Sequence, residues 1–359
     1  MPSRRARYLA PAAVLGAIAL GAWAPTLSAS PNPGLAAISP QQLLVDVQNA
    51  QPPQLSGILN WTANLGIADL SSLVQAGGQG GGGGFNPLSL LSGSYNINLW
   101  LDGTKAEHIS LAQDQPASEV DLVRNGDRAW LWDSSTQTVN EFVGMPTSGT
   151  GSTTTTTTPP LTPQQMATRI LDHLSPTTQV VTGPSVYVAG QPTYPLVLSP
   201  KTTSSTVDHV EIDVGARGDL LGVPLAVSVY ASGQTSPALS LAFSRLSLGE
   251  PAASELTFTP PPGAKVVTHT LGGSQTATTS HHGLTVHGSG WATFVSGPAA
   301  RLGASAQGTL DAVTTVVPVS GQSARLFSTD LLNVLFMNGQ FYAGFVAPSV
   351  LEAAASSAS

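Results

Sequence analysis

Alternation of apolar and polar side chains is clearest between residues 207 and 230, which read VDHVEIDV (207–214), GARGDLLG (215–222) and VPLAVSVY (223–230). Val210, Ile212 and Val214 fall on one face of the first strand, whereas Glu211 and Asp213 fall on the other. Strands with one apolar and one polar face are typical of an antiparallel sheet that water wets on one side only. The glycine-containing stretch at 216–219 predicts a turn between the two strands.

The same period of two recurs along most of the chain, with the Asn125-Gly126 pair as a further hairpin signal. Each of the following sets shares one face of a predicted strand: Leu55, Gly57, Leu59 and Trp61; Ile97, Leu99 and Leu101; Trp130 and Trp132; Leu196 and Leu198; Val223, Leu225, Val227 and Val229; Leu239, Leu241 and Phe243. The chain is therefore expected to form one large antiparallel sheet.

Two short helices are predicted by the same start signal. Ser39-Pro40-Gln41-Gln42 and Thr162-Pro163-Gln164-Gln165 each supply a hydroxyl N-cap, a proline at the first helical position and a glutamine at the third. Apolar residues follow both signals at helical spacing. We expect an α+β fold in which these short helices cover the apolar face of a curved antiparallel sheet.

The composition excludes several classes of protein. Charged residues are 9% of the 359 residues, against roughly 25% in an average soluble domain. Three of the 13 basic residues are Arg4, Arg5 and Arg7, which leaves 10 basic against 20 acidic residues in the rest of the chain. No basic surface for nucleic acid can be built from that balance. The absence of cysteine removes disulfides, thiolate metal sites and thiol nucleophiles.

No catalytic site, metal site or cofactor is predicted, and we expect a protein that is not an enzyme. The chain has no G-x-S-x-G, H-E-x-x-H or P-loop motif, which argues against the alternative of a secreted hydrolase. His281, His282 and His287 could ligate a metal, but they lie in a Gly, Thr and Ser-rich stretch far in sequence from any carboxylate. A solvated loop is the preferred interpretation of that stretch.

The first 30 residues are interpreted as an export signal. Arg4, Arg5 and Arg7 precede an uncharged run at 8–24, and Ser28-Ala29-Ser30 supplies small residues after it. The run is at the low edge of the length that spans a bilayer, so a cleaved signal peptide is preferred to an N-terminal anchor. The general and twin-arginine export routes both stay open. The mature chain is expected outside the cytoplasm: secreted, periplasmic or in the cell envelope.

Breaks in the pattern divide the chain. The Gly-rich segment 77–84 is expected to be a loop and the Thr-rich segment 149–160 a linker, both within a first domain at 31–270. After the polar break that ends near residue 283, residues 284–359 form a C-terminal appendix. There we expect a strand at 291–295, a short helix at 329–336, a turn at Asn338-Gly339 before another strand, and either a final short helix or a frayed tail after Pro348.

Three segments resemble a known family. They are VRNGDRAWLWD (123–133), VNEF (139–142) and FTPPPGAKV (258–266). In this order and spacing they resemble the LolA-like lipoprotein carriers and their RseB/MucB relatives. The resemblance implies a LolA-like incomplete antiparallel β-barrel with helices at its concave side, and an apolar cavity between sheet and helices. It also implies that a lipid or an acylated lipoprotein is bound there.

The predicted cavity is lined by the inward faces of the strands, and Trp130 and Trp132 are its strongest candidates. The alternative is that these residues are ordinary core. The full set is Leu59, Trp61, Leu99, Leu101, Trp130, Trp132, Leu196, Leu198, Val227 and Phe243. The expected function is that of an exported lipid or lipoprotein-acyl carrier. The alternative is an RseB/MucB-like extracytoplasmic regulator, whose partner would be an anti-sigma factor or another membrane protein.

Overall fold

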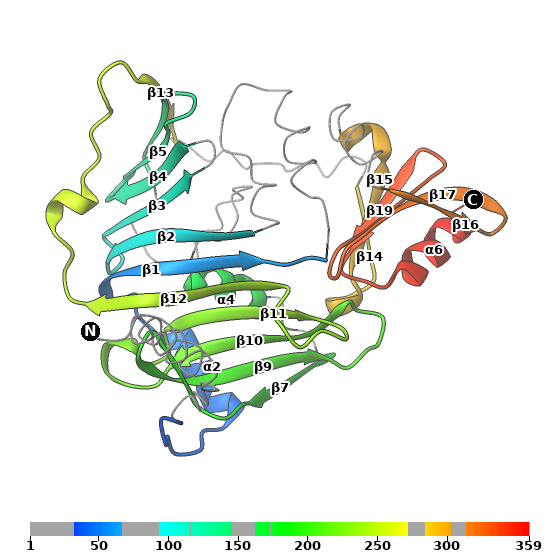
Figure 1. Cartoon of the computed structure of the whole chain (residues 1–359), viewed down its shortest axis with the longest axis horizontal. Coiled ribbons are helices and arrows are strands. Elements are labelled where there is room, and N and C mark those ends of the chain that lie inside the picture. Colours follow the sequence, from blue (N-terminus) through cyan, green and yellow to red (C-terminus); the bar gives the residue numbers. More distant parts are fainter. Residues whose placement is uncertain are drawn as a thin grey trace, which may run out of the picture.

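The computed structural model describes residues 32–66, 93–114, 117–145, 162–172, 174, 176–271, 284–302 and 314–358. Two sheets account for most of them (Figure 1). The expected export signal at 1–30, the Gly-rich loop at 77–84 and the Thr-rich linker at 149–160 lie outside the described residues.

The large sheet has 13 strands among the described residues, in the order β13-β6-β5-β4-β3-β2-β1-β12-β11-β10-β9-β7, with β8 paired to β9. Neighbours are antiparallel except β13, which runs parallel to β6. The end strands β13 and β7 do not pair with each other, so the curved sheet stays open. The predicted α+β fold with an incomplete barrel is therefore confirmed. The strands are β1 Gln54–Ala63, β2 Gly93–Asp102, β3 Ala106–Asp114, β4 Ala117–Asn125, β5 Arg128–Asp133, β6 Thr138–Val143, β7 Thr178–Thr182, β8 Val186–Val188, β9 Gln191–Pro200, β10 Val207–Gly215, β11 Pro224–Ala231, β12 Leu239–Leu248 and β13 Lys265–Thr270.

The strand register brings apolar side chains together on the concave face. Leu59 lies opposite Ile97 of β2 and Phe243 of β12, and residues paired across antiparallel strands share a face. Position 57, on the same face, is a glycine because a Cβ there would come within 2.8 Å of the Phe243 ring. The result is one continuous apolar core on this side of the sheet.

Helices α2 (Pro40–Asn49) and α4 (Pro163–Leu171) lie on the concave side (Figure 1). Their predicted caps are present: Ser39 Oγ accepts from the amide of Gln42 at 3.1 Å, and Thr162 Oγ1 accepts from the amide of Gln165 at 3.2 Å. The apolar stripe of each helix packs into the core of the sheet.

The second sheet has the order β14-β15-β19-β18-β17-β16, and helix α6 (Pro348–Ser357) covers one face of it. Its own core includes Phe294, Leu335, Tyr342 and Leu351. The strands are β14 Thr285–His287, β15 Phe294–Pro298, β16 Thr315–Val319, β17 Gln322–Ser328, β18 Asn333–Met337 and β19 Gln340–Gly344.

Two expectations for this region need correction. The helix predicted at 329–336 is a turn followed by β18, because Thr329 Oγ1 accepts from the amides of Leu331 and Leu332 and stops helical hydrogen bonding. The strand predicted at 291–295 is a 3₁₀ turn, η4 (Gly290–Ala292), followed by β15. The turn at Asn338-Gly339 and the final helix are confirmed.

The second sheet lies beside the large sheet where β1 ends and where β9 turns into β10 (Figure 1). Ser205 forms a β-bridge with Val346, and the amide of Asp330 donates to the carbonyl of Leu65 at 3.0 Å. Leu331 is 1% exposed and belongs to the core of the large sheet. The two sheets therefore share buried surface.

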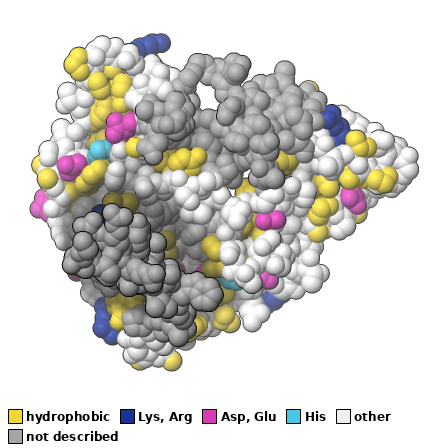
Figure 2. Space-filling view, in the orientation of Figure 1, with side chains coloured by type: hydrophobic (Ala, Val, Ile, Leu, Met, Phe, Trp, Pro, Cys, Tyr) yellow, Lys and Arg dark blue, Asp and Glu magenta, His cyan; other side chains and the backbone are white. Residues whose placement is uncertain are grey.

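None of the described helices has the length and hydropathy that crossing a membrane requires. On the face shown in Figure 2, charged side chains are few and scattered, as the composition predicts.

Candidate functional site

The concave face of the large sheet holds eight of the ten predicted cavity residues. Leu101 is half-buried against the core, and the other seven are buried core residues. These seven are Leu59, Trp61, Leu99, Leu196, Leu198, Val227 and Phe243. The side chains of Leu59, Leu196, Leu198 and Val227 are 0% exposed. No water-sized space touches these four, so they are packed core in the conformation described here.

Trp130 and Trp132 lie on the opposite face, which corrects the prediction that they line the same cavity. Trp130 is paired with Val123 and Trp132 with Asp121, whereas Leu131 is paired with Leu122. Leu122 in turn is paired with Ile109, which belongs to the concave core. Leu131 is therefore the residue of β5 that points to the concave side.

Residues 249–264, which connect β12 to β13 and are here called the outer strap (Figure 1), pack on the outer face of this part of the sheet. Phe258 of the strap lies 6.2 Å from the Trp130 ring centre to centre. His108 Nδ1 bonds the carbonyl of Glu255 at 2.7 Å, and Asn125 Nδ2 donates to the carbonyl of Leu256 at 3.1 Å. The short helix η3 (Ala253–Leu256) thus seals an apolar patch on the outer face.

The helices among the described residues do not cover the concave face evenly. α4 packs chiefly on β11, and α2 packs on β7 and β9. On the other half of the sheet, Leu101, Leu122 and Leu131 lie on the concave face and are only half-buried. Period-two alternation cannot assign Leu122 and Leu131 to this face, because β5 carries apolar residues on both sides. The pairing register assigns them.

An ion pair interrupts this apolar half at its end. Glu107 of β3 and Arg124 of β4 are paired on the concave face, with Nε and Oε2 3.9 Å apart. Gln165 of α4 donates from Nε2 to Glu107 Oε1 at 3.4 Å. Burial raises the pKa of Glu107, and the Arg124 charge partly opposes that rise. The bond joins α4 to the half of the sheet that the described helices α2 and α4 do not cover.

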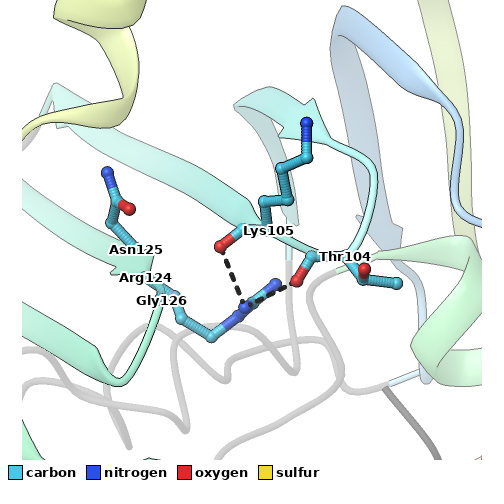
Figure 3. Close-up of a pocket in the computed structure, with 5 residues that line it drawn as sticks. All are labelled: Thr104, Lys105, Arg124, Asn125 and Gly126. Atoms are coloured by element: carbon cyan, nitrogen blue, oxygen red, sulfur yellow. Dashed lines mark hydrogen bonds between the residues drawn. The ribbon is translucent and has the colours of Figure 1, made fainter. Parts of the chain in front are cut away.

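A small pocket lies at the hairpin ends beside this pair, with a volume of about 240 Å³ (Figure 3). It is lined by Thr104, Lys105, Arg124, Asn125 and Gly126. Arg124 Nη1 donates to the carbonyls of Thr104 at 3.0 Å and Lys105 at 3.4 Å. The guanidinium therefore joins two neighbouring hairpins, and the polar lining does not suit an acyl chain.

In the described part of the chain, no three His, Asp or Glu side chains gather as a metal site would require. His287 stacks on Phe294 at 4.8 Å and bonds Ser296 Oγ at 2.8 Å. His281 and His282 lie outside the described residues.

Comparison with known proteins gave matches among solved structures only. No family model matches the chain, and no curated protein matches it. The chain is similar to MucB from the complex of MucA and MucB of Pseudomonas aeruginosa, at 14% identity and a TM-score of 0.42, over 88% of this chain and 95% of that one. It is also similar to a LolA superfamily protein from Nitrosomonas europaea, at 11% identity and a TM-score of 0.25, over 62% and 99% of the two chains.

An uncharacterized conserved protein from Thermus thermophilus is similar at 9% identity and a TM-score of 0.35, over 64% and 98% of the two chains. MucB and the LolA superfamily are the groups that residues 123–142 and 258–266 resemble. At these identities and TM-scores nothing about function is carried over, and the proposals below rest on the residues of this chain.

Proposed function

We propose that this protein is an exported, non-enzymatic carrier that holds the acyl chain of a lipid or lipoprotein on the concave face of its large sheet. Residues 31–270 would form the carrier domain, with residues 1–30 as its export signal and residues 284–359 as an appended domain. The residues proposed to meet the acyl chain first are Leu101, Leu122 and Leu131.

The uneven cover of the concave face carries this proposal. Leu59 and Leu196 are 0% exposed under the sheet's core packing, whereas Leu101, Leu122 and Leu131 remain half-buried on the same face. An apolar face that extends beyond its covering helices is a typical place for an apolar ligand. Trp130 and Trp132 have no part in this site, since they lie on the outer face of the sheet.

Binding would be a partition of the acyl chain from water or membrane to this face. Burial of each CH₂ group contributes about 0.8 kcal/mol, so a long chain outweighs the cost of moving a packed helix. The movement would start at α4, where Gln165 joins Glu107. Residues that are fully buried in this structure, such as Val227, would then contact the ligand only after α4 has moved.

A pair of matched variants tests the site. Leu122→Asn places an amide on the concave face, and Ile58→Asn places one at a half-buried apolar position on the outer face. Binding of a fluorescent fatty acid is expected to weaken about tenfold or more in Leu122→Asn and to change little in Ile58→Asn. Equal affinity in both variants and the parent would contradict the proposed site. Circular dichroism and thermal unfolding check that both variants fold.

The alternative function is that of an extracytoplasmic regulator that binds an anti-sigma factor. The observation in its favour is the second sheet, which has its own core and two edge strands, β14 and β16, that carry Val286 and Val316, 67% and 72% exposed. An edge strand presents backbone groups to which an extended segment of a partner protein can add. Pull-down with the exported part of an anti-sigma factor encoded in the same genome tests this alternative, and Val316→Asp should abolish a genuine complex.

A further inference from the structure

The outer face of β10 carries a row of ionisable side chains away from the proposed acyl site. His209, Glu211 and Asp213 alternate along the strand; Glu211 and Asp213 share that face with partners on β9 and β11, and His209 with Tyr230 of β11. His209 stacks on Tyr230 with ring centres 4.2 Å apart and bonds Asp208 at 2.7 Å. Glu211 is paired with Val197 and Ser228, and Asp213 with Pro195 and Ala226.

Asp213 is the unusual member of this row. Asp213 is only 8% exposed, and its Oδ1 atom has no hydrogen-bond partner. Buried polar atoms in proteins are almost always hydrogen-bonded, and an unpaired buried carboxylate is costly. The neighbours on either side, Pro195 and Ala226, have no side-chain donor.

The surroundings of Asp213 disfavour its negative charge, so a positive charge placed beside it would stabilise the ionised form. Burial raises the pKa of Asp213, and the charge of Glu211 raises it further, to about 7. Glu211 lies on the same face two residues earlier, roughly 7 Å away along the strand. The pKa of Tyr230 is also raised, first by burial and then by Glu211 and Asp213. The only titratable cation in this row, His209, is already bonded to Asp208.

We propose that Glu211 and Asp213 form a binding site for an organic cation, a guanidinium or alkylammonium group, with Asp213 Oδ1 as the deep acceptor and Glu211 as the acceptor nearer the surface. A guanidinium or ammonium group supplies several N–H donors and the opposite charge, and hydrogen bonds to a carboxylate from such donors are among the strongest in proteins. The proposal is independent of the acyl site, because the two lie on opposite faces of the sheet.

The source of the cation is either a basic side chain of a partner polypeptide or a small free amine. The probes are therefore acetyl-Gly-Arg-Gly-amide, its neutral citrulline analogue, and methylguanidinium. The full-length protein is labelled with carbon-13 at its carboxyl groups, and the Asp213 carboxyl signal is titrated with pH with and without each probe by NMR.

The arginine peptide is expected to bind with a dissociation constant of about 1 mM or tighter and to lower the pKa of Asp213 by at least one unit, which corresponds to tenfold tighter binding to the ionised form. The citrulline peptide should leave the Asp213 titration unchanged. Measured by isothermal titration calorimetry, Glu211→Gln and Asp213→Asn should each weaken binding of the arginine peptide, whereas Asp219→Asn, on an exposed turn, should not.

Methylguanidinium distinguishes the two sources. If it binds as tightly as the peptide, the ligand is a small cation; if the peptide binds at least tenfold more tightly, the ligand is a basic polypeptide segment. Equal binding of the arginine and citrulline peptides, no binding of any cation, or unchanged binding to the Glu211→Gln and Asp213→Asn variants would each overturn the proposal.

Discussion

Gln165 of α4 donates a hydrogen bond from Nε2 to Glu107 Oε1 of β3 over 3.4 Å, and so connects this helix to the half of the sheet that the described helices do not cover. A net contribution of about 1 kcal/mol is usual for such a bond. Removing it with Gln165→Ala should therefore speed uptake of a fluorescent fatty acid about fivefold in stopped-flow measurements.

The neighbouring Gln164→Ala is the control for that prediction, because it shortens the same kind of side chain one position earlier in α4. Hydrogen exchange of the α4 amides should also quicken in Gln165→Ala and not in Gln164→Ala. If both variants take up the fatty acid at the parent rate, α4 is not the moving element.

Attachment of the outer strap should depend on pH through His108. Burial alone would lower the pKa of His108, but hydrogen bonds to Asp121 and to the Glu255 carbonyl outweigh it, so the pKa is raised. A raised pKa in the folded state means that the stabilisation is complete below about 6.5, the ordinary histidine value, and is lost as the pH rises through the folded value. Exchange of the amides at 253–264, corrected for intrinsic rates, should be faster at high pH.

The variant His108→Gln should remove this pH dependence and leave the strap as loosely held at low pH as the parent is at high pH. Loss of the bond to Glu255 should cost about 1 kcal/mol at low pH. Strap exchange that follows the same pH profile in the variant would rule out His108 as the group responsible.

Asp213 should destabilise the protein at alkaline pH. Its pKa rises to about 7 because of burial and, secondarily, Glu211. Since the ordinary value is 3.8, stability falls as the pH rises from about 4 to 7 and the loss is complete above that range. Asp213→Asn should thus be more stable than the parent at pH 8, by up to roughly 4 kcal/mol, and similar to it near pH 4. Urea unfolding at both pH values measures this, with Asp219→Asn as a variant that should change neither.

Unfolding of the two sheets should be coupled through Leu331. This residue of the C-terminal part is 1% exposed and packs in the core of the large sheet. Leu331→Ala should cost about 2–5 kcal/mol and lower the unfolding midpoint of both sheets together. Leu351→Ala, within the second core, should lower the protection of amides against hydrogen exchange more in the second sheet than in the large sheet. A biphasic transition in the parent protein would show that the sheets unfold independently.

Much of the fold could be predicted from the sequence, because period-two alternation is a local signal. The helix caps at Ser39 and Thr162 were equally local and are confirmed. The helix expected at 329–336 was wrong, since apolar residues at helical spacing there belong to a strand that follows a Thr329 turn. Spacing alone does not distinguish these two outcomes in a stretch of eight residues.

The site was harder to predict because face assignment is not local. Trp130 and Trp132 share a face, as the sequence predicted, but which face depends on the pairing of Leu131 with Leu122. The outer strap, whose Phe258 contacts Trp130, is more than a hundred residues away in sequence, and no periodicity indicates where it packs. The carboxylate of Asp213 fell on the predicted polar face, yet its burial follows from the packing around it.

The most direct measurement is mass spectrometry of an organic extract of the protein, purified from its native host without detergent. The carrier proposal predicts a stoichiometric acylated molecule in the parent and a reduced amount in Leu122→Asn, with Ile58→Asn like the parent. A parent protein that carries no acylated molecule and binds no fluorescent fatty acid would contradict it.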